Sequence, residues 1–230
     1  MMFTYWNNPE LTVPPSLPIW QDRFPAFKVL GDEDVLPLLT SDQLRKLYIK
    51  ISLPACKSDI ARLVLLQKYG GLYIDAHAAP MNGDKLAETL DILSRYELVL
   101  FSKAWQAKAE NDFNLMNTAI AARRGAPSIN HLLSTAFANL FRQYRLEQEN
   151  GYVPYHLFNL TGTMVMIDCF FLNTKNGYVI RPELEDMIHL YKMTGPSAPG
   201  FELYKFYNYR KLGQHWSERQ TRECLFLPTS

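Results

Sequence analysis

The sequence predicts an α/β fold in which helices cover a mostly parallel β-sheet. Short apolar segments of strand length alternate along the chain with longer segments of helical length. The chain has 230 residues, of which 47% are hydrophobic and 20% charged, as in ordinary globular proteins. This length supports one sizeable core and is short for two. No segment reads as a linker, so we expect residues 1–230 to form a single domain.

The predicted elements follow in order along the chain. Apolar and aromatic runs predict strands at 1–6, 26–30, 72–74, 97–102, 162–167 and 177–180. Helical patterns occupy 34–39, 42–51, 59–69, 127–142 and the surroundings of His189. The helix at 59–69 is apolar on most of its surface, which predicts that it is buried. Ser58 is its candidate N-cap and Gly70 its candidate left-handed C-cap.

Composition excludes several classes of function. The net charge of +1 creates no overall field that would attract nucleic acid or an anionic membrane. The three cysteines lie far apart and form no C-x-x-C pair, which argues against a disulfide framework or a zinc knuckle. We find neither a signal peptide nor an apolar run of membrane-spanning length. These features predict a cytoplasmic protein.

The predicted strand at 72–74 ends in two potential metal ligands, Asp75 and His77. In open α/β sheets, ligands bind beyond the carboxyl ends of the strands. Two residues apart in an extended chain, the two side chains leave the same face and can share one divalent cation. Oxygen and nitrogen ligands together suit Mn²⁺, with Mg²⁺ as an alternative. A solvated Asp beside a partly buried His in a turn is the other interpretation of this short pattern.

Two further charged residues lie three positions apart on the preceding helix. Asp59 and Arg62 therefore share one helical face and can point into the same pocket. The alternative is an ion pair on the surface. The apolar neighbours of both residues argue against it, because a buried charge needs a partner or a ligand.

The segment 58–77, SDIARLVLLQKYGGLYIDAH, closely resembles the signature of glycosyltransferase family 32, and the large clostridial glucosylating toxins carry a related signature. That signature reads S-D-x-x-R on a helix, followed by Y-G-G-x-Y-x-D-x-D. The matching residues are Ser58, Asp59, Arg62, Tyr69, Gly70, Gly71, Tyr73 and Asp75. His77 stands where the signature has its second Asp. Polypeptide GalNAc-transferases use D-x-H for manganese, while a degenerate, inactive copy is the alternative.

The resemblance implies a GT-A type, Rossmann-like fold and a set of site residues. It implies catalytic roles for Asp59, Arg62 and Asp75, with Asp59 accepting hydrogen bonds from sugar hydroxyls. It implies a metal site formed by Asp75, His77 and, within the H-W motif, His215. The donor-binding residues that it implies are Trp6, Asp59, Arg62, Tyr73, Asp75, Asn117 and Trp216. Core packing is the alternative for Trp6. The segment NLTGTMVM resembles the T-G-P stretch of the family, with Thr163 in place of Pro.

The reaction implied is metal-dependent, retaining transfer of a sugar from a nucleoside diphosphate sugar, with UDP as the expected nucleotide. The acceptor implied is a glycan or glycolipid, in bacterial capsule or lipopolysaccharide synthesis. No second carboxylate stands out as a nucleophile, which favours attack from the front face. A non-catalytic sugar-nucleotide or glycan-binding protein and a nucleotide-sugar hydrolase are the alternatives.

The last thirty residues interleave aromatic and basic side chains. These are Tyr204, Lys205, Phe206, Tyr207, Tyr209, Arg210, Lys211 and Trp216. Such a stripe suits peripheral contact with the inner face of a membrane, diphosphate binding or acceptor stacking. Simple packing is the alternative.

Overall fold

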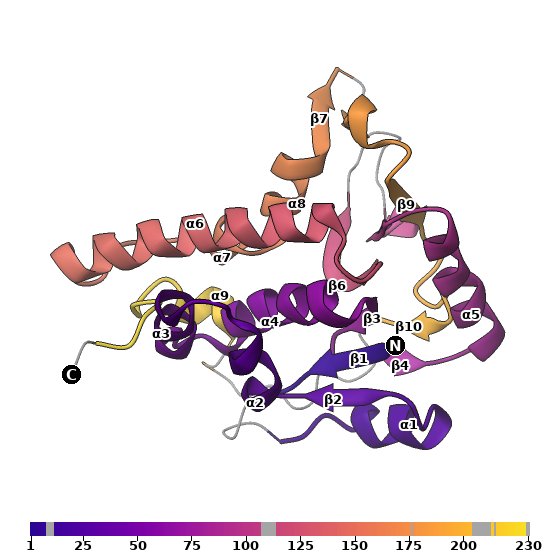
Figure 1. Ribbon diagram of the computed structural model, residues 1–230, viewed down its shortest axis with the longest axis horizontal. Helices are drawn as coiled ribbons and strands as arrows, with labels where there is room; N and C mark the ends of the chain where they lie inside the picture. Colours follow the sequence, from indigo (N-terminus) through magenta and orange to yellow (C-terminus); the bar gives the residue numbers. More distant parts are fainter. Residues whose placement is uncertain (8–11, 107–113, 176, 204–212, 214, 229–230) are drawn as a thin grey trace.

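The central sheet of the computed structural model has six strands in the order β2-β1-β3-β6-β5-β9. The structure describes residues 1–7, 12–106, 114–175, 177–203, 213 and 215–228. The strands of the sheet are β1 (Met2–Tyr5), β2 (Lys28–Leu30), β3 (Gly71–Ile74), β5 (Leu98–Ser102), β6 (Leu115–Ala122) and β9 (Ile188–Lys192). β6 is antiparallel to both of its neighbours, and the other strands run in one direction. This mostly parallel sheet, flanked by helices, confirms the predicted α/β fold class (Figure 1).

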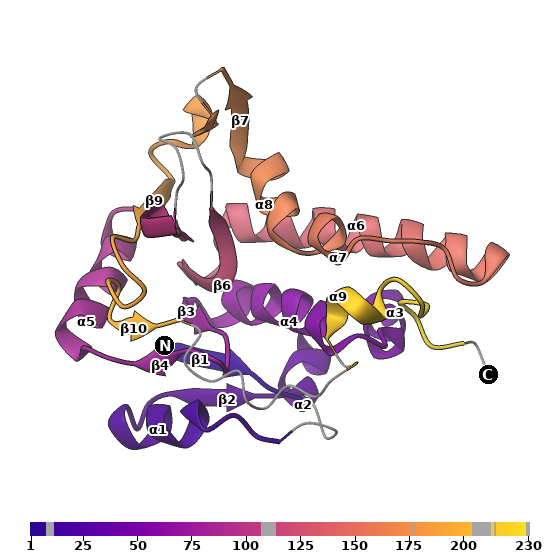
Figure 2. The same ribbon diagram turned by 180° about the vertical axis from the view of Figure 1, so that it is seen from behind.

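Helices cover both faces of this sheet. They are α1 (Ser16–Arg23), α2 (Asp32–Val35), α3 (Asp42–Lys50), α4 (Pro54–Tyr69), α5 (Gly83–Asp91), α6 (Pro127–Asn150), α7 (Leu157–Leu160), α8 (Thr163–Phe170) and α9 (Trp216–Arg219). Short 3₁₀ turns occupy Leu36–Leu38, Ile92–Ser94, Ala104–Gln106 and Pro182–Leu184. α4, α6 and α8 lie on one face and α1 and α5 on the other, which Figure 2 shows from behind.

The strands alternate their side chains between two buried clusters. Tyr73 and Leu100 belong to the cluster under α4, whereas Leu72 and Val99 belong to the cluster on the side of α1 and α5. Successive side chains of a strand point to opposite faces, so a sheet covered on both sides needs apolar residues at every position. This is why β3 and β5 read as continuous apolar runs.

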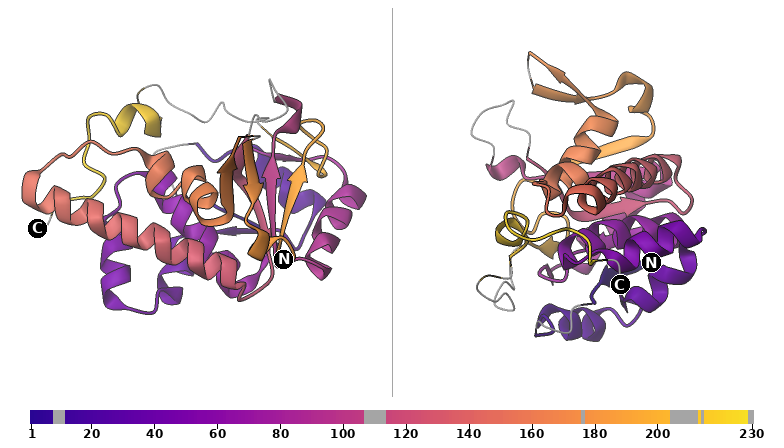
Figure 3. Two further views of the ribbon diagram at one scale, coloured as in Figure 1. Left: turned by 90° about the horizontal axis from the view of Figure 1, so that it is seen from above. Right: turned by 90° about the vertical axis from the view of Figure 1, so that its left-hand side faces the viewer.

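Two small sheets accompany the central one. β4 (Ala79–Pro80) pairs with β10 (Phe201–Glu202), and β7 (Phe171–Thr174) pairs with β8 (Gly177–Ile180). The β7–β8 hairpin projects from the body of the molecule, as Figure 3 shows. No helix among the described residues is both long and apolar enough to span a bilayer. The aromatic and basic positions at 204–212 lie outside the described residues, so the predicted membrane contact of that segment stays a prediction.

Several predicted elements agree with the structure, and others were wrong. Residues 162–167, predicted as a strand, form most of α8. Their short apolar run does not distinguish a buried strand from a buried helix. His189, predicted in a helix, lies in the edge strand β9. Ser58 is not the N-cap, because α4 already begins at Pro54, with Pro at the first helical position. The helix predicted at 127–142 continues to Asn150.

Candidate active site

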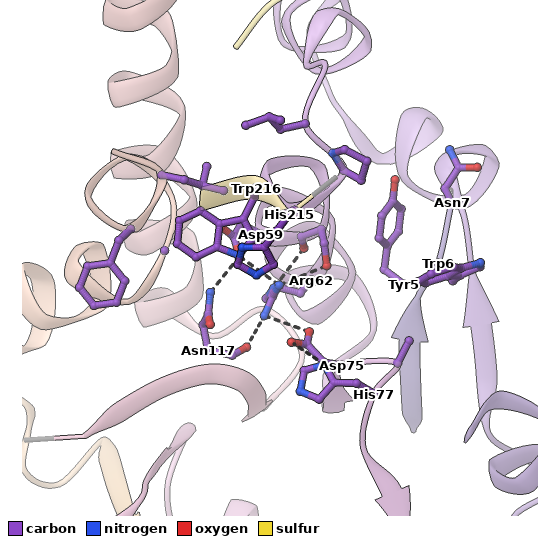
Figure 4. Close-up of a pocket in the computed structure, with 18 of the residues that line it drawn as sticks. Tyr5, Trp6, Asn7, Asp59, Arg62, Asp75, His77, Asn117, His215 and Trp216 are labelled. Atoms are coloured by element: carbon purple, nitrogen blue, oxygen red, sulfur yellow. Dashed lines mark hydrogen bonds and ion pairs between the residues drawn. The ribbon is translucent and has the colours of Figure 1, made fainter. Parts of the chain in front are cut away.

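One cavity opens at the edge of the sheet where β1 and β3 end, and its volume is about 250 Å³. All nine residues implied by the family resemblance line it: Trp6, Asp59, Arg62, Tyr73, Asp75, His77, Asn117, His215 and Trp216. Figure 4 labels each of them except Tyr73. These residues come from the ends of strands, the middle of α4 and the start of α9. The fold therefore brings together side chains that lie up to about 200 positions apart in the sequence.

Asp59 forms the deep part of the cavity on α4. Its side chain is almost completely buried. Oδ1 accepts a hydrogen bond from Nδ2 of Asn117 over 2.9 Å and lies 3.0 Å from Nη2 of Arg62. Oδ2 accepts from the hydroxyl of Thr161 over 2.8 Å. Burial raises the pKa of Asp59 to about 6, although Arg62 and Thr161 act to lower it.

Arg62 connects Asp59 to the end of β3. Nη1 of Arg62 lies 3.3 Å from Oδ1 of Asp75 and also donates to the backbone carbonyl of Asn117. The guanidinium carbon lies 4.6 Å from the centre of the Tyr73 ring. Burial alone would lower the pKa of Arg62, but Tyr73, Asp75 and Asp59 raise it. Arg62 is thus a permanently charged group held between two carboxylates. This buried arrangement excludes the interpretation of Asp59 and Arg62 as an ion pair on the surface.

A chain of hydroxyl groups fixes the carboxylate of Asp75. Nη2 of Arg62 donates to Oγ of Ser58 over 3.1 Å. Oγ of Ser58 lies 3.0 Å from the hydroxyl of Tyr73, which donates to Oδ1 of Asp75 over 2.6 Å. Burial holds the pKa of Tyr73 well above its usual value, so this hydroxyl keeps its proton and donates. Oδ1 of Asp75 is thereby engaged by both Tyr73 and Arg62, and Oδ2 is the oxygen that faces His77.

The backbone turns sharply after β3. The amide of Ala78 donates to the carbonyl of Asp75 over 3.0 Å, so residues 75–78 form a turn and not the extended chain that we expected. Helix α1 supports this turn from one side. The hydroxyl of Ser16 donates to the carbonyl of Ala76, and Nε1 of Trp20 donates to the carbonyl of Ala78 over 2.9 Å. The turn that carries the D-x-H sequence is therefore anchored in the core.

Asp75 and His77 remain close despite the turn. Nδ1 of His77 lies 3.8 Å from Oδ2 of Asp75. This separation is too long for a hydrogen bond. It is short enough for two ligands of one ion, because two metal–ligand bonds of about 2.1 Å span at most about 4.2 Å. The pair of one carboxylate and one imidazole fits a divalent cation such as Mn²⁺.

His215 lines the same cavity but is held by its own helix. Its Nδ1 lies 2.6 Å from Oγ of Ser217 and accepts weakly from the backbone amide of Ser217 at 3.4 Å. In the part of the chain that the structure describes, no three His, Cys, Asp or Glu side chains lie close enough to hold a metal ion together. The three-residue set of Asp75, His77 and His215 is therefore not assembled in this structure.

Aromatic side chains line the cavity at opposite ends. Trp6 follows β1, and its amide donates to the carbonyl of Leu30 over 2.9 Å. Trp216 opens α9, with its ring centre 5.3 Å from that of His215. Figure 4 shows Trp6 and Trp216 on opposite sides of the Arg62 side chain. Both rings are partly exposed, so neither is a simple core residue.

The position of Asn117 depends on an irregularity in β6. The register between β5 and β6 shifts after Leu100, which pairs with Ile120, whereas Phe101 pairs with Met116. Asn117 lies within this bulge and so reaches Asp59 with its side chain and Arg62 with its carbonyl. Asn117, implied by the resemblance as a donor-binding residue, thus lies inside a strand.

Sequence reasoning gave no role in the site to Ser58, Thr161, Phe158 and Arg219, which also line the cavity or contact its residues. The match of Ser58 to the signature and the T-G-P resemblance around Thr161 were the available signals. No sequence signal pointed to Phe158 or Arg219, which both line the cavity.

One part of the chain is similar to a known protein family. Residues 16–83 match the family model described as "Glycosyltransferase sugar-binding region containing DXD motif". None of the curated proteins that were compared matches the sequence. The matched residues, 16–83, contain α1, α4 and β3 and therefore include the turn with Asp75 and His77.

Solved glycosyltransferase domains share a distant structural likeness. The ligand-free domain of the YGT toxin is 14% identical, with a TM-score of 0.41, over 62% of this chain and 49% of that domain. The PaToxG glycosyltransferase is 15% identical, with a TM-score of 0.44, over 73% of this chain and 67% of that one. The catalytic domain of alpha-toxin from Clostridium novyi is 17% identical, with a TM-score of 0.35, over 57% of this chain and 35% of that domain. The match spans about half the length of the first of these domains.

The family match covers residues 58–77, the segment with the sharpest resemblance. Over residues 16–83, the chain is similar to the sugar-binding region of glycosyltransferases that contain a DXD motif.

Proposed function

We propose that the protein transfers a sugar from a nucleoside diphosphate sugar to a glycan acceptor, with retention at the anomeric carbon. The observation that carries this proposal is the buried guanidinium of Arg62. It lies between Asp59 and Asp75 in the floor of a cavity with aromatic residues at both ends. By resemblance, we expect UDP as the nucleotide and Trp6 as the ring that stacks on its base.

The floor of the cavity suits a sugar with several hydroxyl groups. An ionised carboxylate has about four acceptor positions. Asn117, Arg62 and Thr161 occupy about three of those of Asp59. The remaining position is available for a sugar hydroxyl, and the fixed donors hold the carboxylate in one orientation. This arrangement supports the role of Asp59 as an acceptor for the donor sugar.

The pyrophosphate would lie at the end of β3, where Asp75 and His77 would hold a divalent cation. Such an ion, when bound, stabilises the negative charge that gathers on the leaving diphosphate. Arg62 adds a fixed positive charge beside it, without reorganisation during the reaction. Tyr73 and Ser58 keep Asp75 oriented with Oδ2 toward His77. Mn²⁺ is the expected cation, with Mg²⁺ as the alternative.

The family resemblance implies retention, and the state of the carboxylates then favours attack from the front face. Asp59 and Asp75 are the carboxylates among the described residues that line the cavity. Arg62 and hydroxyl or amide donors engage both of them. Neither is presented as a bare nucleophile for a covalent sugar intermediate. We therefore propose that the acceptor hydroxyl attacks on the side of the leaving diphosphate and passes its proton to a phosphate oxygen.

Family resemblance alone supports the biological setting. We propose a role in bacterial capsule or lipopolysaccharide synthesis, in the cytoplasm or at the inner face of the membrane. The assignment of residues 1–230 to one domain stays a prediction.

Release of the nucleoside diphosphate from a panel of UDP-, GDP- and ADP-sugars, with and without Mn²⁺, tests the proposal. We expect release from one class of sugar nucleotide that needs the cation and is absent in Asp75→Ala. Binding without turnover, seen as thermal stabilisation alone, would instead indicate a sugar-nucleotide-binding protein. Steady release of free sugar that no added glycan changes would indicate a hydrolase.

A further inference from the structure

The side chain of Phe158 forms an open apolar surface in the wall of the cavity. It lies on α7, lines the same cavity as Asp59 and Arg62, and is 37% exposed. Its ring meets the ring of His156 edge to face, with centres 6.1 Å apart and an interplanar angle of 86°. A large aromatic ring that stays exposed inside a concave site is a typical feature of ligand-binding surfaces.

Several contacts fix α7 beside the sugar-binding carboxylate. Thr161, which directly follows α7, donates its hydroxyl hydrogen to Oδ2 of Asp59 over 2.8 Å. Nδ2 of Asn139 on α6 donates to the carbonyl of Leu160 over 3.1 Å. Gly162 packs so closely that a Cβ atom there would lie 2.9 Å from Cα of Phe158. Phe158 is therefore held in place three residues from a group that contacts Asp59.

This position assigns Phe158 to one end of the cavity. The proposed nucleotide end is marked by Trp6 at the end of β1, whereas α7 is tied to Asp59, which the proposed function assigns to the transferred sugar. An acceptor must reach the anomeric carbon of that sugar. We therefore assign the cavity wall formed by α7, next to Asp59, to the acceptor.

The chemistry of this surface suits a carbohydrate. The apolar faces of sugar rings pack on flat aromatic rings, while their hydroxyl groups point outward to polar neighbours. His156 and Asn159, which flank Phe158 in the sequence, are exposed outside the cavity lining and carry such polar groups. α7 has the sequence LFNL, without a charged side chain. A neutral aromatic surface in a concave site fits one sugar ring better than a charged patch on a protein acceptor.

We propose that the ring of Phe158 is the stacking surface for the acceptor, and that the acceptor presents a neutral sugar ring. This inference rests on the proposed function and names its acceptor subsite. Phe158 binds and orients this ring, and the reacting groups remain those of the donor site.

Two readouts on the same variants test the inference. Release of UDP from the donor, without acceptor, reports the donor site. The second readout reports the acceptor site and uses methyl glycosides of glucose, galactose, mannose and N-acetylglucosamine as probes. Their binding is measured by saturation-transfer NMR with UDP and Mn²⁺ present, and their use as acceptors is measured in transfer assays. The variants are Phe158→Ala, Phe158→Tyr and the control Leu172→Ala. Leu172 is 38% exposed on β7, a closely matched apolar side chain that does not line the cavity.

We expect Phe158→Ala to lower the ratio of transfer to hydrolysis by about tenfold or more, through a higher acceptor KM. The NMR signals of the bound glycoside should weaken in parallel, Phe158→Tyr should restore both, and Leu172→Ala should resemble the original protein. An unchanged acceptor KM in Phe158→Ala would overturn the inference. Equal losses of transfer and hydrolysis would do so too, because they indicate a structural role.

Failure of the subsite and failure of the proposed function give different results. If the original protein releases no nucleoside diphosphate from any sugar nucleotide of the panel, with or without added glycosides, the proposed function is wrong. If it releases UDP but none of the glycosides binds or accepts sugar, the donor site stands and the carbohydrate subsite is wrong. Transfer to a protein side chain in that second case would assign the acceptor to a different class.

Discussion

Arg62 lies with Nη1 3.3 Å from Oδ1 of Asp75, and this contact joins the middle of helix α4 to the end of strand β3. The same guanidinium lies 3.0 Å from Asp59. The guanidinium of Arg62 therefore holds two carboxylates of the proposed donor site at fixed positions before any ligand binds. Preorganised charge of this kind is usually the largest contribution to the stabilisation of a charged leaving group in an enzyme.

Replacing Asp75 by Ala should remove metal-dependent turnover. The substitution deletes the carboxylate whose Oδ2 faces His77 and leaves Arg62 with one partner fewer. We expect kcat to fall by about 100-fold or more, as when a group that stabilises transition-state charge is lost. The measurement is UDP release with Mn²⁺, combined with a titration of Mn²⁺ binding by calorimetry. Full activity in this variant would remove Asp75 from the mechanism.

Arg62 and Arg45 offer a matched comparison of stability. Both form an ion pair with an Asp three positions earlier on a helix, but the Arg62–Asp59 pair is buried and the Arg45–Asp42 pair is exposed. Arg62→Ala leaves buried carboxylates without their cation, so we expect a loss of about 3–5 kcal/mol in the free energy of unfolding. Arg45→Ala should cost less than about 1 kcal/mol. Urea unfolding measures the free energy of unfolding of both variants. Equal losses in the two variants would contradict the buried network.

The pKa of Asp59, about 6, predicts a pH dependence of donor binding. Below about pH 6 the carboxyl is protonated and loses an acceptor for the sugar hydroxyls. The affinity for the UDP-sugar should then fall relative to the affinity for UDP, which lacks the sugar. Calorimetry between about pH 5 and pH 8 measures this ratio. Asp59→Asn, which does not titrate, should show a flat ratio, and a sloping ratio in that variant would assign the effect to another group.

The same raised pKa predicts the opposite trend for stability. The folded protein binds this proton more tightly than the unfolded chain, in which the pKa is near 3.8. The contribution to stability is thus complete below pH 3.8 and is lost as the pH rises through about 6. The free energy of unfolding of the original protein, relative to Asp59→Asn, should decline across this window. A rise over the same window would contradict the raised pKa.

His77→Asp should change metal preference more than it changes activity. The substitution restores the D-x-D pattern and replaces an imidazole with an oxygen ligand, which favours Mg²⁺ relative to Mn²⁺. His77→Ala removes the ligand and should weaken Mn²⁺ binding by about tenfold or more. Electron paramagnetic resonance of bound Mn²⁺, with competition by Mg²⁺, provides a readout other than turnover. If His77→Ala and His77→Asp both bind Mn²⁺ as tightly as the original protein does, His77 is not a ligand.

The sequence predicts the part of the fold where local and tertiary signals agree. The apolar run of α4 ends at Gly70, whose φ of 64° is the left-handed conformation that glycine adopts easily. A buried strand follows at once, and Asp75 comes at its end. Capping, hydrophobicity and turn chemistry all favour the same structure there. The wrong assignment of 162–167 arose where only one signal, a short apolar run, was present.

The site was less predictable where it depends on long-range packing. The contact of Thr161 with Asp59 joins residues 102 positions apart, and Asn117 reaches the site through a β-bulge. No local pattern encodes either arrangement. The turn after Asp75 was missed as well, because support from Ser16 and Trp20 in α1 determines its shape. Likewise, no sequence signal indicated that the ring of Phe158 is exposed in the cavity.

A crystal structure of the protein with UDP and Mn²⁺, recorded with anomalous scattering at the manganese edge, tests the central claim most directly. The account predicts one anomalous peak bonded to Oδ2 of Asp75 and to His77, with the diphosphate on the ion and the uracil ring on Trp6. A manganese peak away from Asp75, or a nucleotide bound outside the cavity floored by Arg62, would contradict it.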